Sequence, residues 1–231
     1  MAALAIGLIS WTRGTLAPTD TALQALTSDA QVQVSPADGL ITFAAAGQTA
    51  DTGLIFYPGG HVDYRAYAPP LRQIAAQGYF VAVAEMPLDL AFFKTNAADA
   101  IIAANPGIQH WVIGGHSLGG VAAASYASEH AAIEGIAFWA SYPANDALKD
   151  SAIKVISIFG TQDGLATKQD IDDSQPLLPT EAQFVAITGG NHSQFGAYGF
   201  QQGDNPATIS PEEQWAQIAE VMVQFLATVN E

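Results

Sequence analysis

Short apolar runs alternate with amphipathic runs along most of this chain. Eight segments rich in apolar, β-branched and aromatic residues predict strands near residues 31–34, 39–44, 53–57, 79–84, 109–114, 133–140, 154–159 and 182–188. From the third strand onward, helical patterns intervene near residues 64–77, 95–104, 118–130 and 209–228. Continuous apolar strands between helices indicate an α/β fold, in which helices cover both faces of a mostly parallel sheet. The first two segments alternate more regularly, so we expect them to form an antiparallel edge.

The length of the chain is typical of one hydrophobic core. Its 231 residues are 49% hydrophobic and contain no proline-rich linker or repeat. We therefore expect an N-terminal apolar segment and lead-in over residues 1–30 and a single domain over residues 31–231. Residues 1–11 are apolar apart from Ser10, but they are shorter than the ~20 residues that span a bilayer and lack the positive start of a secretory signal. We interpret them either as a docked helix or as the remnant of a truncated membrane anchor, which leaves the compartment open between cytoplasmic and membrane-associated.

The composition excludes several classes of partner. With 7 Lys and Arg against 22 Asp and Glu, the formal net charge is −15, which disfavours nucleic-acid binding because phosphate contacts need clustered basic residues. The same charge repels anionic substrates, so we expect a neutral small molecule. The absence of cysteine excludes disulfides, thiolate metal sites and cysteine nucleophiles. No glycine-rich nucleotide loop and no histidine pair at helical spacing occur, so we expect neither a cofactor nor a metal ion.

Residues 115–119 read Gly-His-Ser-Leu-Gly and lie between a predicted strand and a helix of small residues. A Gly-x-Ser-x-Gly sequence in this context places its serine at the apex of a strained turn. Glycine is needed on both sides because strand and helix pass too close for larger side chains. We therefore predict that Ser117 is a catalytic nucleophile, and we expect His116 to pack behind the turn.

An acid and a histidine follow at the ends of later strands. Asp163 comes after the predicted strand at 154–159, and His192 comes after the one at 182–188. A serine needs a neutral imidazole to take its proton, and a carboxylate fixes the tautomer of that imidazole. The order serine, acid, histidine is the one found in α/β-hydrolases. Asp146, after the preceding strand, is the alternative acid, whereas His110 and His130 are expected to be structural.

The same chemistry requires backbone N–H groups that bind the oxyanion of the tetrahedral intermediate. One donor is expected to be the amide of Leu118, directly after the nucleophile. The other is expected from the glycine-rich loop after the strand at 53–57, where Gly60 is the first choice and His61 the second.

The segment between the strands at 133–140 and 154–159 is too short to form a cap domain, because only about a dozen residues separate them. We therefore expect a shallow, open pocket, roofed only by residues 86–93 and by residues 195–209. The aromatic residues Phe195, Tyr198 and Phe200 either line this pocket or anchor their loop to the surface. Tyr142 is a further candidate for substrate binding.

Five segments carry a resemblance to a known family: YPGGHVDYRAYAP at 57–69, EMPLDLAF at 85–92, GGHSLGG at 114–120, GTQDG at 160–164 and GGNHSQFG at 189–196. They resemble the bacterial α/β-hydrolase-5 group, relatives of the dienelactone hydrolases and small carboxylesterases, over about residues 37–230. The resemblance implies an α/β-hydrolase fold and a triad of Ser117, Asp163 and His192. The natural substrates of this group are mostly unassigned, so the resemblance leaves specificity open.

These patterns predict a serine hydrolase of the carboxylesterase class (EC 3.1.1) that cleaves neutral esters, with short acyl groups, through an acyl-enzyme intermediate. A lactone or dienelactone-type hydrolase and an acyltransferase are the alternatives among enzymes. Outside enzymes, the alternative is a ligand-binding module that uses the same fold.

Overall fold

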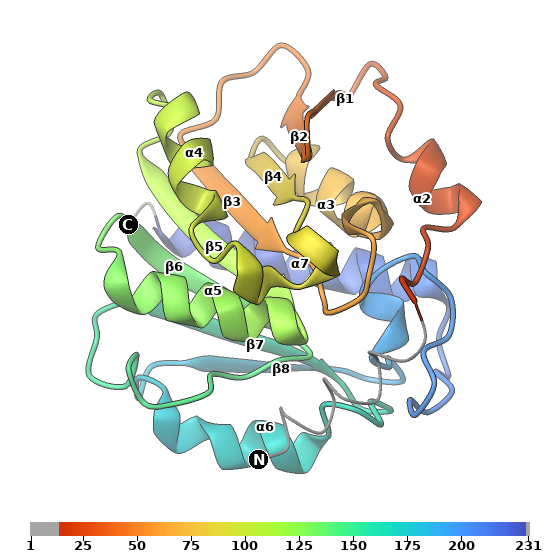
Figure 1. The fold of residues 1–231 in the computed structure, drawn as a ribbon, viewed down its shortest axis with the longest axis vertical. Helices are drawn as coiled ribbons and strands as arrows, with labels where there is room; N and C mark the ends of the chain where they lie inside the picture. The colour runs from red at the N-terminus through yellow and green to blue at the C-terminus, as the bar shows by residue number, and fades with distance from the viewer. Residues whose placement is uncertain (1–13, 230–231) are drawn as a thin grey trace.

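The computed structural model describes residues 14–229, and its centre is one eight-stranded sheet (Figure 1). The spatial order of the strands is β1-β2-β4-β3-β5-β6-β7-β8. Their bounds are β1 (Val32–Ala37), β2 (Leu40–Ala45), β3 (Thr52–Tyr57), β4 (Phe80–Ala84), β5 (His110–His116), β6 (Ile133–Trp139), β7 (Lys154–Gly160) and β8 (Gln183–Ile187). All eight predicted strands are confirmed, with bounds that differ from the prediction by at most a few residues.

Antiparallel strand pairs occur only at one edge of the sheet. β1 pairs with β2 and β2 pairs with β4 in antiparallel register, whereas every pair from β4 to β8 is parallel. The expected antiparallel edge is therefore confirmed. The parallel strands all end at one side of the sheet, and the loops that follow them meet there.

Helices cover both faces of the sheet, as Figure 1 shows. α3 (Ala68–Ala75) and α7 (Pro211–Val229) pack against each other on one face. α4 (Ala97–Ala104) and α5 (Leu118–Glu129) bury their apolar side chains on the other. Each face thus has its own apolar core, and this two-sided burial explains why β3 is buried at every position.

The shorter helices were not predicted as separate elements. The helix expected at 64–77 begins as a 3₁₀ turn, η1 (Tyr64–Tyr67), and becomes α3 where two prolines occupy the first turn. The remaining short elements are α2 (Asp20–Gln24), η2 (Pro87–Asp89), η3 (Ala91–Phe93), α6 (Lys168–Ser174), η4 (Gln175–Leu177) and η5 (Ser193–Phe195). α2 begins at a Thr19 cap and α6 at a capping box of Thr167 and Asp170, and both helices are too short to show a periodic apolar face.

The connection between β6 and β7 contains no cap domain that could cover the carboxyl ends of the strands. Residues 140–153 form turns and bends without a helix or strand. The prediction of a fold without a cap in this connection is therefore confirmed.

The interpretation of residues 1–11 concerns a segment outside the described residues. Within residues 14–229, no helix is long and apolar enough to cross a membrane.

Candidate active site

Ser117 occupies the sharp turn between β5 and α5, with φ 50° and ψ −122°. A positive φ is strained for any residue with a Cβ, and such strain is stored at functional sites. A Cβ added to Gly115 would lie 2.4 Å from the carbonyl carbon of Gly119, and one added to Gly119 would lie 2.3 Å from the carbonyl oxygen of Pro58. The two glycines are therefore required by close approach, as the sequence predicted. Ser117 itself is only partly buried.

Asp163 and His192 form a hydrogen-bonded pair, although 29 residues separate them. The distance between Asp163 Oδ2 and His192 Nδ1 is 2.9 Å, and both side chains are fully buried. Asp163 Oδ1 accepts the backbone N–H groups of Leu165 at 2.8 Å and Ala166 at 2.7 Å. Because a carboxylate only accepts, Nδ1 carries the hydrogen and Nε2 of the neutral ring is left as the acceptor.

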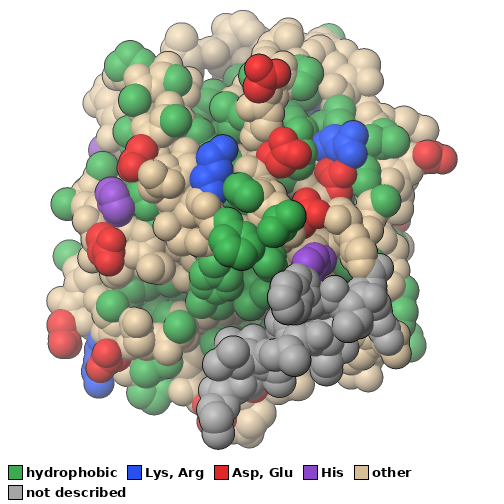
Figure 2. Space-filling model, viewed as in Figure 1, with side chains coloured by type: hydrophobic (Ala, Val, Ile, Leu, Met, Phe, Trp, Pro, Cys, Tyr) green, Lys and Arg blue, Asp and Glu red, His purple; other side chains and the backbone are tan. Residues whose placement is uncertain are grey.

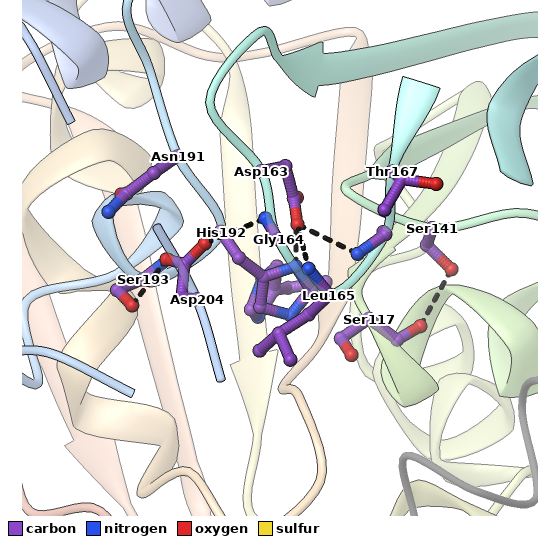
Figure 3. A network of polar contacts seen from close by, with 12 residues as sticks. Ser117, Ser141, Asp163, Gly164, Leu165, Thr167, Asn191, His192, Ser193 and Asp204 are labelled. Atoms are coloured by element: carbon purple, nitrogen blue, oxygen red, sulfur yellow. Dashed lines mark hydrogen bonds and ion pairs between the residues drawn. The ribbon is translucent and has the colours of Figure 1, made fainter. Parts of the chain in front are cut away.

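Ser117 and the Asp163–His192 pair lie at the same edge of the sheet, and Figure 3 shows Ser117 beside this pair. The ring of His116, the residue before Ser117, lies with its centroid 4.4 Å from that of His192. Nε2 of His192 has no hydrogen-bond partner among the described residues. Ser117 and Nε2 of His192 are therefore not hydrogen-bonded in this structure, and such bonds at active sites are commonly long in the absence of substrate.

Buried polar side chains fix both residues that flank His192. Gln214 of α7 accepts the backbone N–H of Asn191 at 3.0 Å and donates to its carbonyl at 2.9 Å. On the other side, Asp204 Oδ2 accepts the backbone N–H of Ser193 at 2.8 Å, and its Oδ1 accepts the N–H of Gly164 at 3.0 Å. Asp204 therefore links the histidine loop to the residue after Asp163 (Figure 3). Sequence reasoning missed both side chains.

Gln214→Leu is expected to lower the free energy of unfolding by about 2 kcal/mol or more, because it leaves two buried backbone groups of Asn191 without partners. Gln217→Leu is the matched control, since Gln217 lies on the same helix and its side chain makes no hydrogen bond among the described residues. We expect the control to change stability by no more than about 0.5 kcal/mol. Urea denaturation measures both values, and equal effects would contradict the assigned role of Gln214.

Two backbone amides at the site have no hydrogen-bond partner in the described part of the chain. Gly60 N and Leu118 N have no hydrogen-bond acceptor within residues 14–229. The two residues lie together, since a Cβ added to Gly60 would be 2.6 Å from Leu118 Cδ1. The amide of His61, the second choice from the sequence, donates instead to the carbonyl of Asp89 at 2.8 Å. That hydrogen bond joins two loops that lie far apart in the sequence, so no local pattern predicts it.

A small hollow of about 20 Å³ adjoins Ser117. It is lined by Ser117, Leu118, Val121, Ala140, Ser141, Tyr142 and Ala166. A hollow of this size holds about one water-sized group. Burial, together with Asp170 and Asp163, raises the pKa of Tyr142, so its phenol is neutral. Of the four candidate substrate-binding side chains, Tyr142 is the one that lines this hollow.

The aromatic residues after His192 lie elsewhere. Phe195 is fully buried and its ring stacks on His116 with centroids 5.6 Å apart, while Tyr198 is buried against Tyr67. These positions favour the alternative that both rings anchor the loop. Phe200 is 60% exposed and lines a separate groove beside α7, with Trp215.

The alternative acid Asp146 and the two histidines expected to be structural make no hydrogen bond or ion pair with Asp163 or His192 among the described residues. Asp146 is exposed in the turn after β6, and its carboxylate has no hydrogen bond to His192. His110 contacts Glu134 at 3.0 Å, and His130 stacks on Tyr126 at the end of α5. No group of three or more His, Asp or Glu side chains within the described residues is placed to hold a metal ion.

The loop at 86–93 exposes apolar side chains next to the site. Leu88, Phe92 and Phe93 are exposed, and η3 packs against α5. Leu90 Cδ2 lies 3.4 Å from the position of a Cβ added to Gly60. Figure 2 shows apolar side chains gathered on this face of the molecule. No residue of this loop lines the hollow beside Ser117, so the expectation that residues 86–93 roof the pocket stays a prediction.

Comparisons with known proteins agree with this architecture. Solved structures with the same fold include an esterase domain from Rhodothermus marinus, with 13% identity, a TM-score of 0.63 and coverage of 84% of this chain and 97% of that one. A predicted CIB-like hydrolase from Thermoplasma acidophilum has 13% identity, a TM-score of 0.63 and coverage of 85% and 98%. The protein TT1662 from Thermus thermophilus has 13% identity, a TM-score of 0.65 and coverage of 87% and 99%.

A comparison with curated proteins found no match. The model of the alpha/beta hydrolase family, in contrast, matches residues 53–216, which is more than half of the chain and includes Ser117, Asp163 and His192. By this match, and in agreement with its sheet order and strand–turn–helix junction, the chain belongs to the alpha/beta hydrolase family.

Proposed function

We propose that this protein is a serine hydrolase that cleaves neutral carboxylic esters through an acyl-enzyme intermediate. The observation that carries the proposal is the buried Asp163–His192 hydrogen bond, with Nε2 of His192 left unpaired at the edge of the sheet where Ser117 occupies a strained turn. This arrangement has the parts that an activated serine requires: a nucleophile, a base and a group that orients the base.

In the first half of the reaction, Nε2 of neutral His192 takes the proton of the Ser117 hydroxyl as its oxygen attacks the ester carbonyl. Asp163 stabilises the imidazolium that forms, since Oδ2 already accepts from Nδ1. The amides of Gly60 and Leu118 donate to the oxyanion. His192 then gives its proton to the departing alcohol, which leaves Ser117 acylated. In the second half, a water molecule takes the place of the alcohol and the same steps run in reverse order.

The shape and charge of the protein support a short, neutral acyl group. The hollow of about 20 Å³ beside Ser117 accommodates little more than a methyl group, and residues 140–153 supply no cap over it. Each buried methylene contributes ~0.8 kcal/mol, but a chain that extends beyond the hollow stays in water and gains almost none of this. The net charge of −15 disfavours an anionic substrate.

Across p-nitrophenyl esters from acetate to palmitate, kcat/KM is expected to be highest for the shortest acyl groups, without a rise in activity at an oil–water interface. Tyr142→Ala, which enlarges the hollow, should shift the maximum toward longer chains. Tyr79→Ala is the matched control, because it removes the same side chain from a partly buried position whose hydroxyl donates to the carbonyl of Val223 on α7. A maximum at about ten carbons or longer with interfacial activation would contradict the short-chain proposal.

A further inference from the structure

His116 is a buried titratable group that the proposed mechanism does not use. It ends β5, and its ring lies between His192, at a centroid distance of 4.4 Å, and Phe195, on which it stacks. Burial, and secondarily the neighbouring His192, lower the pKa of His116 well below 6.5, while the backbone of His192 offsets part of this. The ring is therefore neutral, with one nitrogen that donates and one that accepts.

The hydroxyl of Tyr67 connects His116 to the loop after β3, which contains Gly59 and Gly60. Tyr67 Oη is 2.9 Å from the backbone nitrogen of Gly59 and 2.9 Å from Nδ1 of His116. A backbone N–H only donates, so Tyr67 accepts from Gly59. Its own hydrogen then goes to Nδ1 of His116, which makes His116 the Nε2–H tautomer. Burial raises the pKa of Tyr67, so the phenol keeps this hydrogen.

The backbone of Gly59 packs closely against the side chains of Tyr67 and His116. A Cβ added to Gly59 would lie 2.7 Å from His116 Nδ1 and 2.9 Å from Tyr67 Oη. The next residue is Gly60, whose amide has no acceptor among the described residues. The carbonyl of Gly59 belongs to the same peptide unit as the Gly60 N–H, and it accepts the backbone N–H of Val62 at 3.2 Å. The contacts on both sides of Gly59 together set the orientation of the Gly60 amide.

We propose that Tyr67 and His116 form a positioning pair, which holds the Gly59–Gly60 turn so that the Gly60 amide faces the oxyanion of the bound ester. The proposal rests on the proposed function for its effect on catalysis. Neither side chain reacts with the substrate, and the effect is exerted through the backbone of the loop.

The test uses Tyr67→Phe in the full chain, which removes the hydroxyl and keeps the ring. We expect kcat for p-nitrophenyl acetate to fall about 10- to 100-fold with KM nearly unchanged, because a displaced oxyanion donor weakens transition-state binding more than ground-state binding. We also expect the amide hydrogen of Gly59 to exchange with solvent about tenfold faster or more, because the Tyr67 hydroxyl is its acceptor.

Tyr57→Phe is the matched control. Tyr57 is equally buried, and its hydroxyl also accepts a backbone N–H, that of Ala98, and donates to a carbonyl, that of Thr95. It belongs to the core on the opposite face of the sheet. A loss of kcat in Tyr57→Phe equal to that in Tyr67→Phe would reduce the effect to general destabilisation and overturn the proposal.

Variants of His116 separate positioning from packing. His116→Asn keeps an acceptor near the place of Nδ1 and should retain more kcat than His116→Leu, which removes it. Tyr67→Phe combined with His116→Leu should lose no more than the worse single variant, because both changes break the same connection. Additive losses would contradict the pair.

The two proposals fail in different ways. A wild-type protein without esterase activity would contradict the proposed function, yet faster exchange at Gly59 in Tyr67→Phe would still support the positioning of the turn. Unchanged exchange at Gly59, or faster exchange with unchanged kcat in an active enzyme, would overturn the positioning pair.

Discussion

The Ser117→Ala variant is expected to lose ester turnover by up to about six orders of magnitude in kcat, because the nucleophile, base and acid act as one unit. Alanine keeps the Cβ of serine, so the turn between β5 and α5 should form as before. The residual activity should not exceed the rate enhancement that substrate positioning and the oxyanion amides provide without a nucleophile. Steady-state kinetics on p-nitrophenyl acetate measures the loss.

Ser125→Ala provides the control for this variant. Ser125 is exposed on the same helix, α5, and its removal should leave kcat unchanged. Circular dichroism and urea denaturation should give wild-type values for both variants. Retention of more than a few per cent of the activity by Ser117→Ala, in a preparation free of contaminating esterases, would exclude Ser117 as the nucleophile.

Asp163→Asn is expected to reduce kcat by about four orders of magnitude. The carboxylate accepts the N–H groups of Leu165 and Ala166 and the Nδ1–H of His192. Asparagine can preserve the first two hydrogen bonds through its carbonyl oxygen, but its NH₂ group then faces Nδ1 and favours the wrong tautomer of the ring. The fold should therefore persist while the base loses its function.

Asp146→Asn is the matched control, because Asp146 is the other acid that the sequence offered and is exposed after β6. We expect it to change kcat by less than about twofold, as for an ordinary surface substitution. The reverse ranking of the two variants would mean that the acid is supplied from the preceding strand.

The features of the site that depend on local sequence could be predicted. The Gly-x-Ser-x-Gly segment needs only a strand before it and a helix after it, and the structure has both around Ser117. Asp163 and His192 follow β7 and β8, and parallel strands bring such positions to one edge of the sheet. The eight strands were predictable for the same reason, since each is a short apolar run between turn residues.

The buried side chains that hold the loops of the site make contacts between segments far apart in the sequence. Such contacts could not be predicted from a single sequence. Gln214 is a polar residue at a buried position of α7, and its partner Asn191 lies 23 residues earlier. The hydroxyl of Tyr67 meets His116 across 49 residues. A buried glutamine on the apolar face of a helix is a usable signal in principle, because such a side chain must find a partner. The identity of that partner follows only from the fold.

The aromatic residues after His192 illustrate a second limit. Their spacing in a glycine-rich loop is compatible with lining a pocket or with anchoring the loop. Phe195 packs on His116 and Tyr198 on Tyr67, so both complete the core beneath the site, whereas Phe200 points out of it. The burial of Phe195 and Tyr198 depends on the path of the loop, which turns back so that the backbone N–H of Ala197 donates to the carbonyl of Ala66.

Reaction with a fluorophosphonate probe, followed by mass spectrometry of the labelled peptide, tests most directly whether Ser117 is an activated nucleophile. We expect one probe per protein, attached to Ser117, with no labelling of Ser117→Ala and a rate that falls sharply in Asp163→Asn. Labelling at another residue, or no labelling of the folded wild-type protein, would contradict the proposed serine hydrolase and favour a ligand-binding role for this fold.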